Sequence, residues 1–224
     1  MRILVIAAHP DDEILGCGGT AAKLANIDNQ VYTLILGEGI TARYENTNCR
    51  EVAQKIEELR KQMHKANQIV GIKKVFTYGF PDNKFDTVAM LDIVKTIEKV
   101  RNDIKPDIIF THYEKDLNVD HQITYKAVIT ATRPLPNETV REIYTFEVPS
   151  STEWAYPLSF SPNTFFDITN TIELKIKALE CYKSEVESFP HPRSAESVHS
   201  NAKCWGTKVG LEYAEAFKCI RRII

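Results

Sequence analysis

Features typical of secreted and disulfide-bonded proteins are scarce in this sequence. The five cysteines are scattered, and none forms a CxxC pair. An odd number of isolated cysteines argues against a disulfide framework and is typical of a reduced, cytosolic chain. The apolar run after Arg2 lasts about six residues, which is too short for a signal-peptide core, and no run approaches the about 18 residues of a membrane span. We therefore expect a cytoplasmic protein without a membrane span.

Strong charge of one sign is absent as well. The 224 residues include 28 basic and 30 acidic side chains, with a formal net charge of −2 and no basic run of five or more. A nucleic-acid partner would require a basic surface, so none is expected. No internal repeat, low-complexity tract or clear linker interrupts the chain. Residues 1–224 are therefore predicted to form a single domain, large enough to bury a sizeable core.

Strand-like and helix-like segments alternate along the chain. Short apolar segments predict strands, and amphipathic segments predict helices between them. The predicted strands are 2–8, 30–37, 73–79, 107–112, 142–148 and 163–169, and the predicted helices are 13–26, 48–70, 90–103, 121–133, 170–185 and 194–210. Alternation of this kind predicts an α/β fold with a mostly parallel sheet and helices on both faces.

Three polar residues stand at the end of the first predicted strand. His9, Asp11 and Asp12 follow it directly and open the next helix, and in an open parallel sheet ligands bind beyond the carboxyl ends of the strands. These residue types serve as metal ligands and general bases. A structural explanation is equally open here, because an aspartate at a helix N-terminus is a common cap that the helix dipole stabilises. A metal site requires a further ligand elsewhere.

The fourth predicted strand supplies that ligand. It ends in HYEKDLNVDHQ, a second acidic and histidine-bearing loop that also opens a helix. Two such loops on neighbouring strands would face one crevice, and a catalytic zinc keeps three protein ligands and a water. His112 and His121 compete to join His9 and Asp12, and spacing alone does not choose between them. Asp11 is then free to accept a proton, which indicates metal-assisted hydrolysis.

Two longer motifs surround these residues, AHPDDEILGCGGTAAKLA at 8–25 and HYEKDLNVDHQ at 112–122. Together they resemble the LmbE/PIG-L-like family of zinc-dependent N-deacetylases. Further matches, which extend the resemblance over most of the chain, are Arg60, Asp82, PHPRS at 190–194 and YAEAF at 213–217. The resemblance implies a Rossmann-like α/β fold with the metal site at the carboxyl ends of the strands. It also implies hydrolysis of an acetamide, usually on N-acetylglucosamine or a conjugate of it.

The resemblance assigns roles at the centre. It implies His9, Asp12 and His121 as the zinc ligands, which favours His121 over His112. It implies Asp11 as general base on a zinc-bound water, although the ligand set also tolerates Fe²⁺. The implied partner is a small-molecule N-acetyl sugar or sugar conjugate, converted to acetate and a free amine. A homo-oligomer is left open.

One position departs from the family pattern. Many members have a histidine three residues before the metal histidine, thought to stabilise the developing charge or to protonate the leaving amine, whereas this chain has Asn118. An asparagine cannot act as a general acid, but it donates a hydrogen bond to an oxyanion. Either Asp11 performs both proton transfers, which we favour, or another group such as His191 supplies the acid. Asp120 is expected to orient His121 or another polar group.

Substrate-binding roles are expected for five further residues, most of which have a simpler alternative. They are Arg43, Arg60, Asp82, His191 and Arg193. Arg43 and Arg193 suit a phosphate or diphosphate on a larger substrate, or equally lie in surface loops. Arg60 stands in a charge-rich helix, where a solvated ion pair is the default. Asp82 either accepts hydrogen bonds from sugar hydroxyls or starts a turn.

Three other functions compete with hydrolysis. GCGGTA at 16–21 fits a loose dinucleotide-binding motif, but its glycines fall inside the predicted helix instead of in the turn after the first strand. Two histidines and a carboxylate also describe a non-haem Fe(II) oxygenase, but alternating strands and helices are not the all-β barrel associated with most such enzymes. A non-catalytic metal- or sugar-binding protein would have no use for Asp11, a carboxylate beside the metal that does not bind it.

Overall fold

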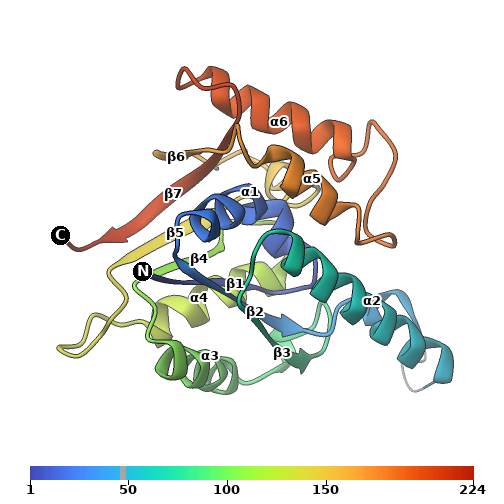
Figure 1. The fold of residues 1–224 in the computed structure, drawn as a ribbon. Helices are drawn as coiled ribbons and strands as arrows, with labels where there is room; N and C mark the ends of the chain where they lie inside the picture. The colour runs from blue at the N-terminus through green and yellow to red at the C-terminus, as the bar shows by residue number, and fades with distance from the viewer. Residues whose placement is uncertain (46–48) are drawn as a thin grey trace.

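The computed structural model describes residues 1–45 and 49–224 and is built on one seven-stranded sheet (Figure 1). The strands are β1 (Arg2–Ala7), β2 (Gln30–Gly37), β3 (Lys74–Phe80), β4 (Ile108–His112), β5 (Glu142–Phe146), β6 (Thr164–Asp167) and β7 (Ala214–Arg222). Their order across the sheet is β3-β2-β1-β4-β5-β7-β6. β1 to β5 run parallel to one another, and β7 runs antiparallel to both β5 and β6.

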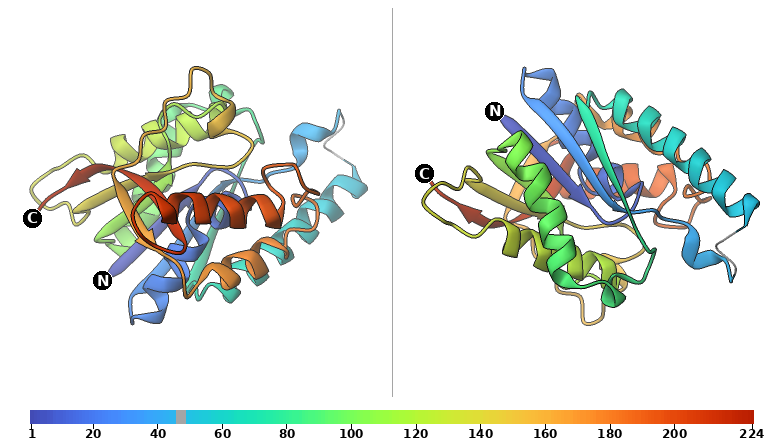
Figure 2. Two further views of the ribbon diagram at one scale, coloured as in Figure 1. Left: turned by 90° about the horizontal axis from the view of Figure 1, so that it is seen from above. Right: turned by 90° about the horizontal axis from the view of Figure 1, so that it is seen from below.

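Helices cover both faces of the sheet (Figures 1 and 2). They are α1 (Asp12–Asn26), α2 (Arg50–Ile69), α3 (Met90–Ile104), α4 (Val119–Ala131), α5 (Ile172–Leu179) and α6 (Ala195–Thr207). Alternate residues of β1 point to opposite faces, as the pleat of a strand requires. Ile3 and Val5 join the apolar cluster beneath α1 and α2, and Leu4 and Ile6 join the cluster beneath α3 and α4. The continuous apolar sequence of β1 follows from this burial on both faces.

The order of the strands reverses beside β1. The chain leaves β1 through α1 toward β2, and β4 later pairs with the opposite edge of β1. The loop after β1 leads to α1 on one face, and the loop after β4 leads to α4 on the other (Figure 1). In open α/β sheets this is where ligands bind, beyond the carboxyl ends of the two diverging strands.

The glycines of α1 serve close packing. A Cβ atom on Gly16 would come within 2.2 Å of the Phe146 ring, and one on Gly19 would come within 2.9 Å of Ile168. Both glycines lie inside the helix, away from the turn that a dinucleotide phosphate would need. They therefore allow α1 to approach β5 and the segment after β6.

The predicted parallel α/β fold with helices on both faces is confirmed, with differences near the C-terminus. β7 is absent from the elements predicted from the sequence, and the predicted helix 170–185 ends at Leu179. The predicted helix 48–70 begins at Arg50, and Asn48 lies outside the described residues. No helix in the described part of the chain is long and apolar enough to cross a bilayer.

Candidate metal centre

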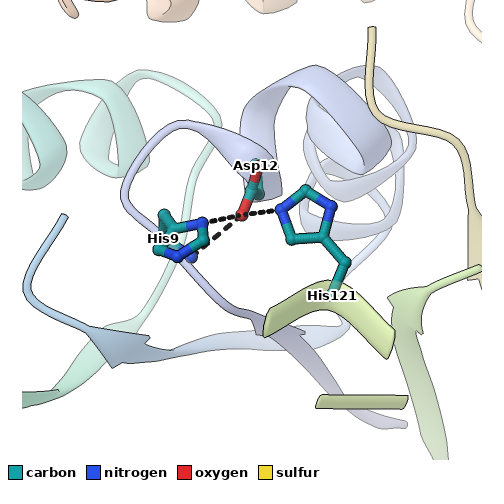
Figure 3. Close-up of side chains that lie close together, drawn as sticks. All are labelled: His9, Asp12 and His121. Carbon is teal, nitrogen blue, oxygen red and sulfur yellow. Dashed lines mark hydrogen bonds and ion pairs between the residues drawn. The ribbon is translucent and has the colours of Figure 1, made fainter. Parts of the chain in front are cut away.

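Three side chains meet at the carboxyl ends of β1 and β4 (Figure 3). His9 follows β1, Asp12 is the first residue of α1, and His121 lies in the first turn of α4. One potential ligand atom from each lies within 4.8 Å of the others. We call these three residues the candidate metal centre.

Asp12 lies between the two imidazole rings (Figure 3). Its Oδ2 atom is 3.4 Å from His9 Nδ1 and 3.2 Å from His121 Nε2. The same oxygen accepts a hydrogen bond of 2.9 Å from the backbone N–H of His9, so the carboxylate points back toward β1. The side chains of Asp12 and His121 are each only 1% exposed.

Two buried polar atoms of this centre have no hydrogen-bond partner, Asp12 Oδ1 and His121 Nε2. An unsatisfied buried polar group costs about 1–3 kcal/mol, and here both atoms belong to side chains that converge on one place. Imidazole nitrogen and carboxylate oxygen are natural zinc ligands. The residues present therefore fit a divalent metal ion.

The electrostatics of the centre also favour a cation. Burial lowers the pKa of His9, but hydrogen bonds to Asp12 and Asp120 outweigh burial and raise the pKa to about 10. Burial also lowers the pKa of His121, and the charges of Asp12 and Asp116 raise it to about 9. Protonated imidazoles thus compensate the carboxylates in the metal-free protein, and a bound cation would replace that charge.

The structure distinguishes His121 from His112 as a candidate metal ligand. The Nε2 atom of His112 accepts a hydrogen bond of 2.8 Å from the backbone N–H of Ala8, so the nitrogen nearest the centre is already engaged. Burial and the neighbouring charge of His121 lower the pKa of His112 well below its usual range. The two rings stack with centroids 4.0 Å apart. His112 therefore supports the ring of His121 from beneath.

A carboxylate stands behind each histidine of the centre. Asp116 Oδ1 lies 3.0 Å from His121 Nδ1, and Asp120 Oδ2 lies 2.9 Å from His9 Nε2. Such partners orient metal-binding imidazoles and set their tautomer. The partner of Asp120 is thus His9 and not His121, because consecutive residues at the start of α4 point in different directions. Asp116 takes the place beside His121.

A second group of possible ligands shares His9. Its Nε2 atom faces Asp82 Oδ1 at 3.3 Å as well as Asp120, and these three residues also bring potential ligand atoms within 4.8 Å of one another. Both oxygens of Asp120 already accept hydrogen bonds, from His9 and from the backbone N–H of Phe85. The first group fits a metal better because two of its atoms lack partners.

Asp11 lies beside the centre in an unusual conformation. It is the N-cap residue of α1 with φ of 109°, yet its side chain makes no capping hydrogen bond, so the simple helix-cap explanation does not apply. Its carboxylate accepts a hydrogen bond of 2.8 Å from Arg193 Nη1, and its backbone N–H donates to Glu13 at 2.9 Å. Burial raises the pKa of Asp11 well above its usual value, although the charge of Arg193 opposes the shift.

A cavity of about 100 Å³ adjoins the centre at His9. Its charged lining residues are His9, Asp11, Arg43, Asp82, Glu185 and Arg193. Arg43 Nη2 contacts Glu185 Oε2 at 2.5 Å, and Asp82 accepts a hydrogen bond of 3.0 Å from the backbone N–H of Ala42. Four residues expected from the sequence to bind substrate or act as base therefore share this cavity: Asp11, Arg43, Asp82 and Arg193.

Asn118 also lines the cavity, but part of its amide is engaged. Its side-chain oxygen caps α4 by accepting the backbone N–H of Asp120, and its Nδ2 donates to Asn83 at 2.8 Å. An amide nitrogen carries two N–H groups, so one remains for a ligand.

Two expected substrate residues lie outside the cavity lining, Arg60 and His191. Arg60 is exposed on α2, one residue after Leu59, which is buried and does line the cavity. Neighbouring residues on a helix point about 100° apart, which directs Arg60 away. His191 packs edge-on against Trp154 and accepts the backbone N–H of Arg193, so it shapes the turn that carries Arg193.

Three important residues are absent from the predicted site: Glu13, Asp116 and Glu185. Glu13 and Asp116 lie within the two motifs, and their acidic side chains close to the expected ligands are a signal that could have found them. Glu185 stands in no such motif, and only the tertiary structure brings it into the cavity.

Comparisons with known proteins agree on one family. The sequence matches PIG-L, described as GlcNAc-PI de-N-acetylase, over residues 4–132, more than half of the chain. It is 28% identical over 188 residues to the uncharacterized deacetylase YaiS of Escherichia coli, covering 81% of this chain and 90% of that protein. It is 25% identical over 226 residues to the diacetylchitobiose deacetylase of Thermococcus kodakarensis, covering 98% of this chain and 83% of that protein.

One solved structure with a similar fold belongs to a protein with a different activity. GalB, the 4-carboxy-2-hydroxymuconate hydratase of Pseudomonas putida, superposes with a TM-score of 0.75 at 22% identity, covering 100% of this chain and 97% of that one. At this identity the likeness shows the fold alone. The reaction has to be argued from the residues of the site.

Proposed function

The chain belongs to the PIG-L family of deacetylases, and from that membership we propose a zinc-dependent hydrolase that removes the acetyl group from an N-acetyl sugar. The substrate is N-acetylglucosamine or a conjugate of it, and the products are acetate and a free amine. The family and the diacetylchitobiose deacetylase support the sugar. The donor set of His9, Asp12 and His121 supports the metal.

The placement of Asp11 carries the proposal. Its side chain borders the cavity beside the candidate metal centre, is 3% exposed and makes no capping bond. Arg193 holds one of its oxygens, and Glu13 holds its backbone N–H. A purely structural site has no need of such a carboxylate, whereas hydrolysis needs a general base within reach of the attacking water.

Each residue of the centre has a defined task in this proposal. His9, Asp12 and His121 would hold a zinc ion, which when bound would supply Lewis-acid chemistry to a carbonyl oxygen and ease the loss of a proton from water. Asp11 takes that proton as the water attacks the acetamide carbon.

The remaining tasks concern charge and the leaving group. Asn118 has one N–H left to donate to the developing oxyanion. Asp11 then returns the proton to the leaving nitrogen as the C–N bond breaks. His191 does not line the cavity, which favours Asp11 over His191 for the second transfer. Asp82, at the opening beside His9, accepts hydrogen bonds from the sugar.

Released acetate tests the proposal directly. The purified protein would be incubated with one equivalent of Zn²⁺, and separately with a chelator, against free N-acetylglucosamine, its neutral glycosides and its phosphate-linked forms. We expect acetate and an equal amount of free amine only in the presence of metal. If no member of the panel yields acetate although one metal ion is bound per chain, the protein is not this deacetylase, and a non-catalytic metal- or sugar-binding role takes its place.

A further inference from the structure

The charged side chains above the centre form a continuous chain of ion pairs. Arg193 Nη1 lies 2.8 Å from Asp11 Oδ2 and 3.6 Å from Glu185 Oε2. The same Glu185 oxygen lies 2.5 Å from Arg43 Nη2. Glu185 therefore occupies the guanidinium group of Arg43 and shares that of Arg193 with Asp11.

The position of Glu185 makes this pairing effective. Its side chain is 7% exposed, whereas that of Arg193 is 20% exposed and that of Arg43 is 52% exposed. Solvent screens the charge on the exposed part of Arg43, but it screens the charge of the buried Glu185 carboxylate much less. The backbone of Glu185 is fixed by a hydrogen bond of 2.9 Å to the carbonyl of Tyr182, in the turns that follow α5.

In the zinc-loaded protein, negative charge exceeds positive charge around the cavity. Among its described lining residues, the carboxylates of Asp11, Asp82 and Glu185 face two guanidinium groups, and His9 carries no charge once it has lost its proton to bind zinc. The centre below adds the carboxylates of three aspartates, Asp12, Asp116 and Asp120, against which a bound zinc ion would set only two positive charges. A guanidinium binds phosphate strongly when its N–H groups are free to form a bidentate pair. Here Asp11 and Glu185 hold those groups.

We propose that this cavity selects N-acetyl sugars whose attached group is uncharged, and that Glu185 sets this preference by occupying Arg43 and Arg193. The inference rests on the proposed deacetylase function and names its substrate class. An incoming phosphate or carboxylate has to displace Glu185 from the arginines or enter beside the carboxylates of Asp11, Asp82 and Glu185, and either event weakens its binding. A neutral glycoside meets neither obstacle. The phosphate-binding role expected of the two arginines from the sequence is thereby replaced by one of holding carboxylates.

Relative turnover of matched substrates tests the inference. The zinc-loaded protein would be assayed on the methyl glycoside of N-acetylglucosamine and on N,N′-diacetylchitobiose, and then on N-acetylglucosamine 1-phosphate and its UDP-linked form. We expect kcat/KM for the neutral pair to exceed that for the anionic pair at least tenfold. Equal or higher values for the anionic pair would overturn the inference while leaving the deacetylase function intact.

Product binding separates the two proposals where turnover fails. Calorimetry would compare glucosamine with glucosamine 1-phosphate as ligands of the zinc-loaded protein. Tighter binding of glucosamine supports the charge preference even without acetate release, and tighter binding of the phosphate overturns it. Failure of both ligands to bind overturns it as well.

Two matched variants locate the cause. Glu185→Gln releases the arginines, and we expect the ratio of neutral to anionic kcat/KM to fall at least tenfold. Glu187→Gln makes the same charge change at an exposed position of the same loop, and the ratio should stay at the wild-type value. An equal fall in both variants would mean that overall charge, and not Glu185, sets the preference.

If Glu185→Gln fails to fold, the wild-type kcat/KM comparison and the calorimetric comparison of the two amines still decide the inference.

Discussion

Asp11 and Asp12 are adjacent carboxylates with opposite behaviour. Burial raises the pKa of both, but the positive charge of His121 reverses the effect at Asp12 and holds its pKa well below the usual range. At Asp11 burial prevails over the charge of Arg193, and the pKa rises well above the usual value. Asp12 therefore stays an anion suited to binding a metal, and Asp11 suits a group that accepts a proton and returns it.

Replacement of Asp11 by asparagine tests that division. In Asp11→Asn the side chain keeps its size but loses its basicity, and since general base catalysis contributes about 10²- to 10⁴-fold, we expect kcat to fall by about that factor. Metal stoichiometry should stay at the wild-type value because Asp12 and both histidines remain. Steady-state kinetics and metal analysis on the same preparation check both statements.

A control for Asp11→Asn is available in the turn before β2. Asp28 is exposed and also has a positive φ, of 60°, so Asp28→Asn repeats the chemical change at another positive-φ position away from the cavity. It should keep wild-type kcat. A fully active Asp11→Asn variant would show that another group is the base.

Metal binding should strengthen as the pH rises. The pKa values of about 10 for His9 and about 9 for His121 mean that both rings carry protons in the metal-free protein near neutrality, and a ligand nitrogen has to lose its proton to bind metal. We expect the apparent affinity for Zn²⁺ to rise between pH 6 and pH 9, with release of protons. Calorimetry in two buffers of different ionisation enthalpy measures that release, and an affinity independent of pH would contradict the assignment.

The same shifts determine how the metal-free fold responds to pH. Because the folded pKa values of His9 and His121 exceed the ordinary 6.5, their protonation stabilises the fold fully below about pH 6.5. This contribution is lost as the pH rises through about 9 to about 10. The rise in melting temperature on adding Zn²⁺ should therefore be larger at pH 9 than at pH 7.

The sequence predicts which residues gather at the site better than it predicts their partners. His9 and Asp12 stand next to His121 because strand ends and helix starts are readable from the chain, and a parallel sheet places them at one edge. The pairing of Arg193 with Asp11 spans 182 positions, and it depends on the turns after α5. No local pattern specifies such a contact.

At the scale of elements, the start of α1 is held by a buried acid. Glu13 Oε2 accepts the backbone N–H of Asp11, and Glu13 Oε1 accepts Asn67 Nδ2 at 2.8 Å and the hydroxyl of Tyr182. Asn67 comes from α2 and Tyr182 from the turn after α5. Three elements thus fix the backbone of Asp11 in a conformation that non-glycine residues rarely adopt.

Loss of this anchor should reduce turnover more than substrate binding. In Glu13→Gln one oxygen becomes an N–H₂ group that faces other donors, so the peptide of Asp11 shifts. Since small misplacements of a reacting group cost up to about 10²-fold, we expect kcat to fall about 10- to 100-fold with KM nearly unchanged. Tyr182→Phe removes one donor and should cost less.

A double-mutant comparison shows whether Glu13 acts through Asp11. Added to Asp11→Asn, the Glu13→Gln change should reduce the residual rate no further, because the group it positions has already been removed. If the two losses multiply instead, Glu13 supports the fold in general and does not position the base.

Whether the sequence predicts a strand depends on the surroundings of that strand in the fold. β1 to β4 are apolar or alternate cleanly, and all four were expected within one or two residues of their bounds. β7 mixes buried alanines with Glu215 and ends in exposed arginine, so its sequence lacks a clear period of two. Its strand conformation depends on β5 and β6, which it joins in antiparallel pairing.

At the scale of the whole molecule, a buried ion pair ties the C-terminal strand to the site. Lys175 Nζ on α5 lies 2.6 Å from Glu215 Oε1 on β7, and it donates to the carbonyl of Leu15 at 2.7 Å. Glu215 also accepts the backbone N–H groups of Gly19 and Thr20. Both ionic side chains are 5% exposed. The pair therefore connects β7 and α5 to the middle of α1, the helix that begins with Asp12.

Breaking one member of this pair should destabilise the fold without altering the chemistry. Lys175→Met leaves Glu215 buried without its cation, and removal of one partner from a buried pair costs about 3–5 kcal/mol. We expect the free energy of unfolding to fall by that amount, measured by urea denaturation of the zinc-loaded protein. The kcat of the protein that remains folded should stay near the wild-type value, because neither residue lines the cavity.

The double variant shows whether the cost comes from the unpaired charge. In Lys175→Met with Glu215→Gln no charge is left buried, while the glutamine oxygen still accepts an N–H group from α1. Since an ion pair replaced as a whole costs far less than one that is broken, the double variant should be more stable than Lys175→Met alone. If the double variant is less stable than the wild type by the sum of the two single losses, the two residues contribute independently, and the coupling of β7 to α1 does not run through their charges.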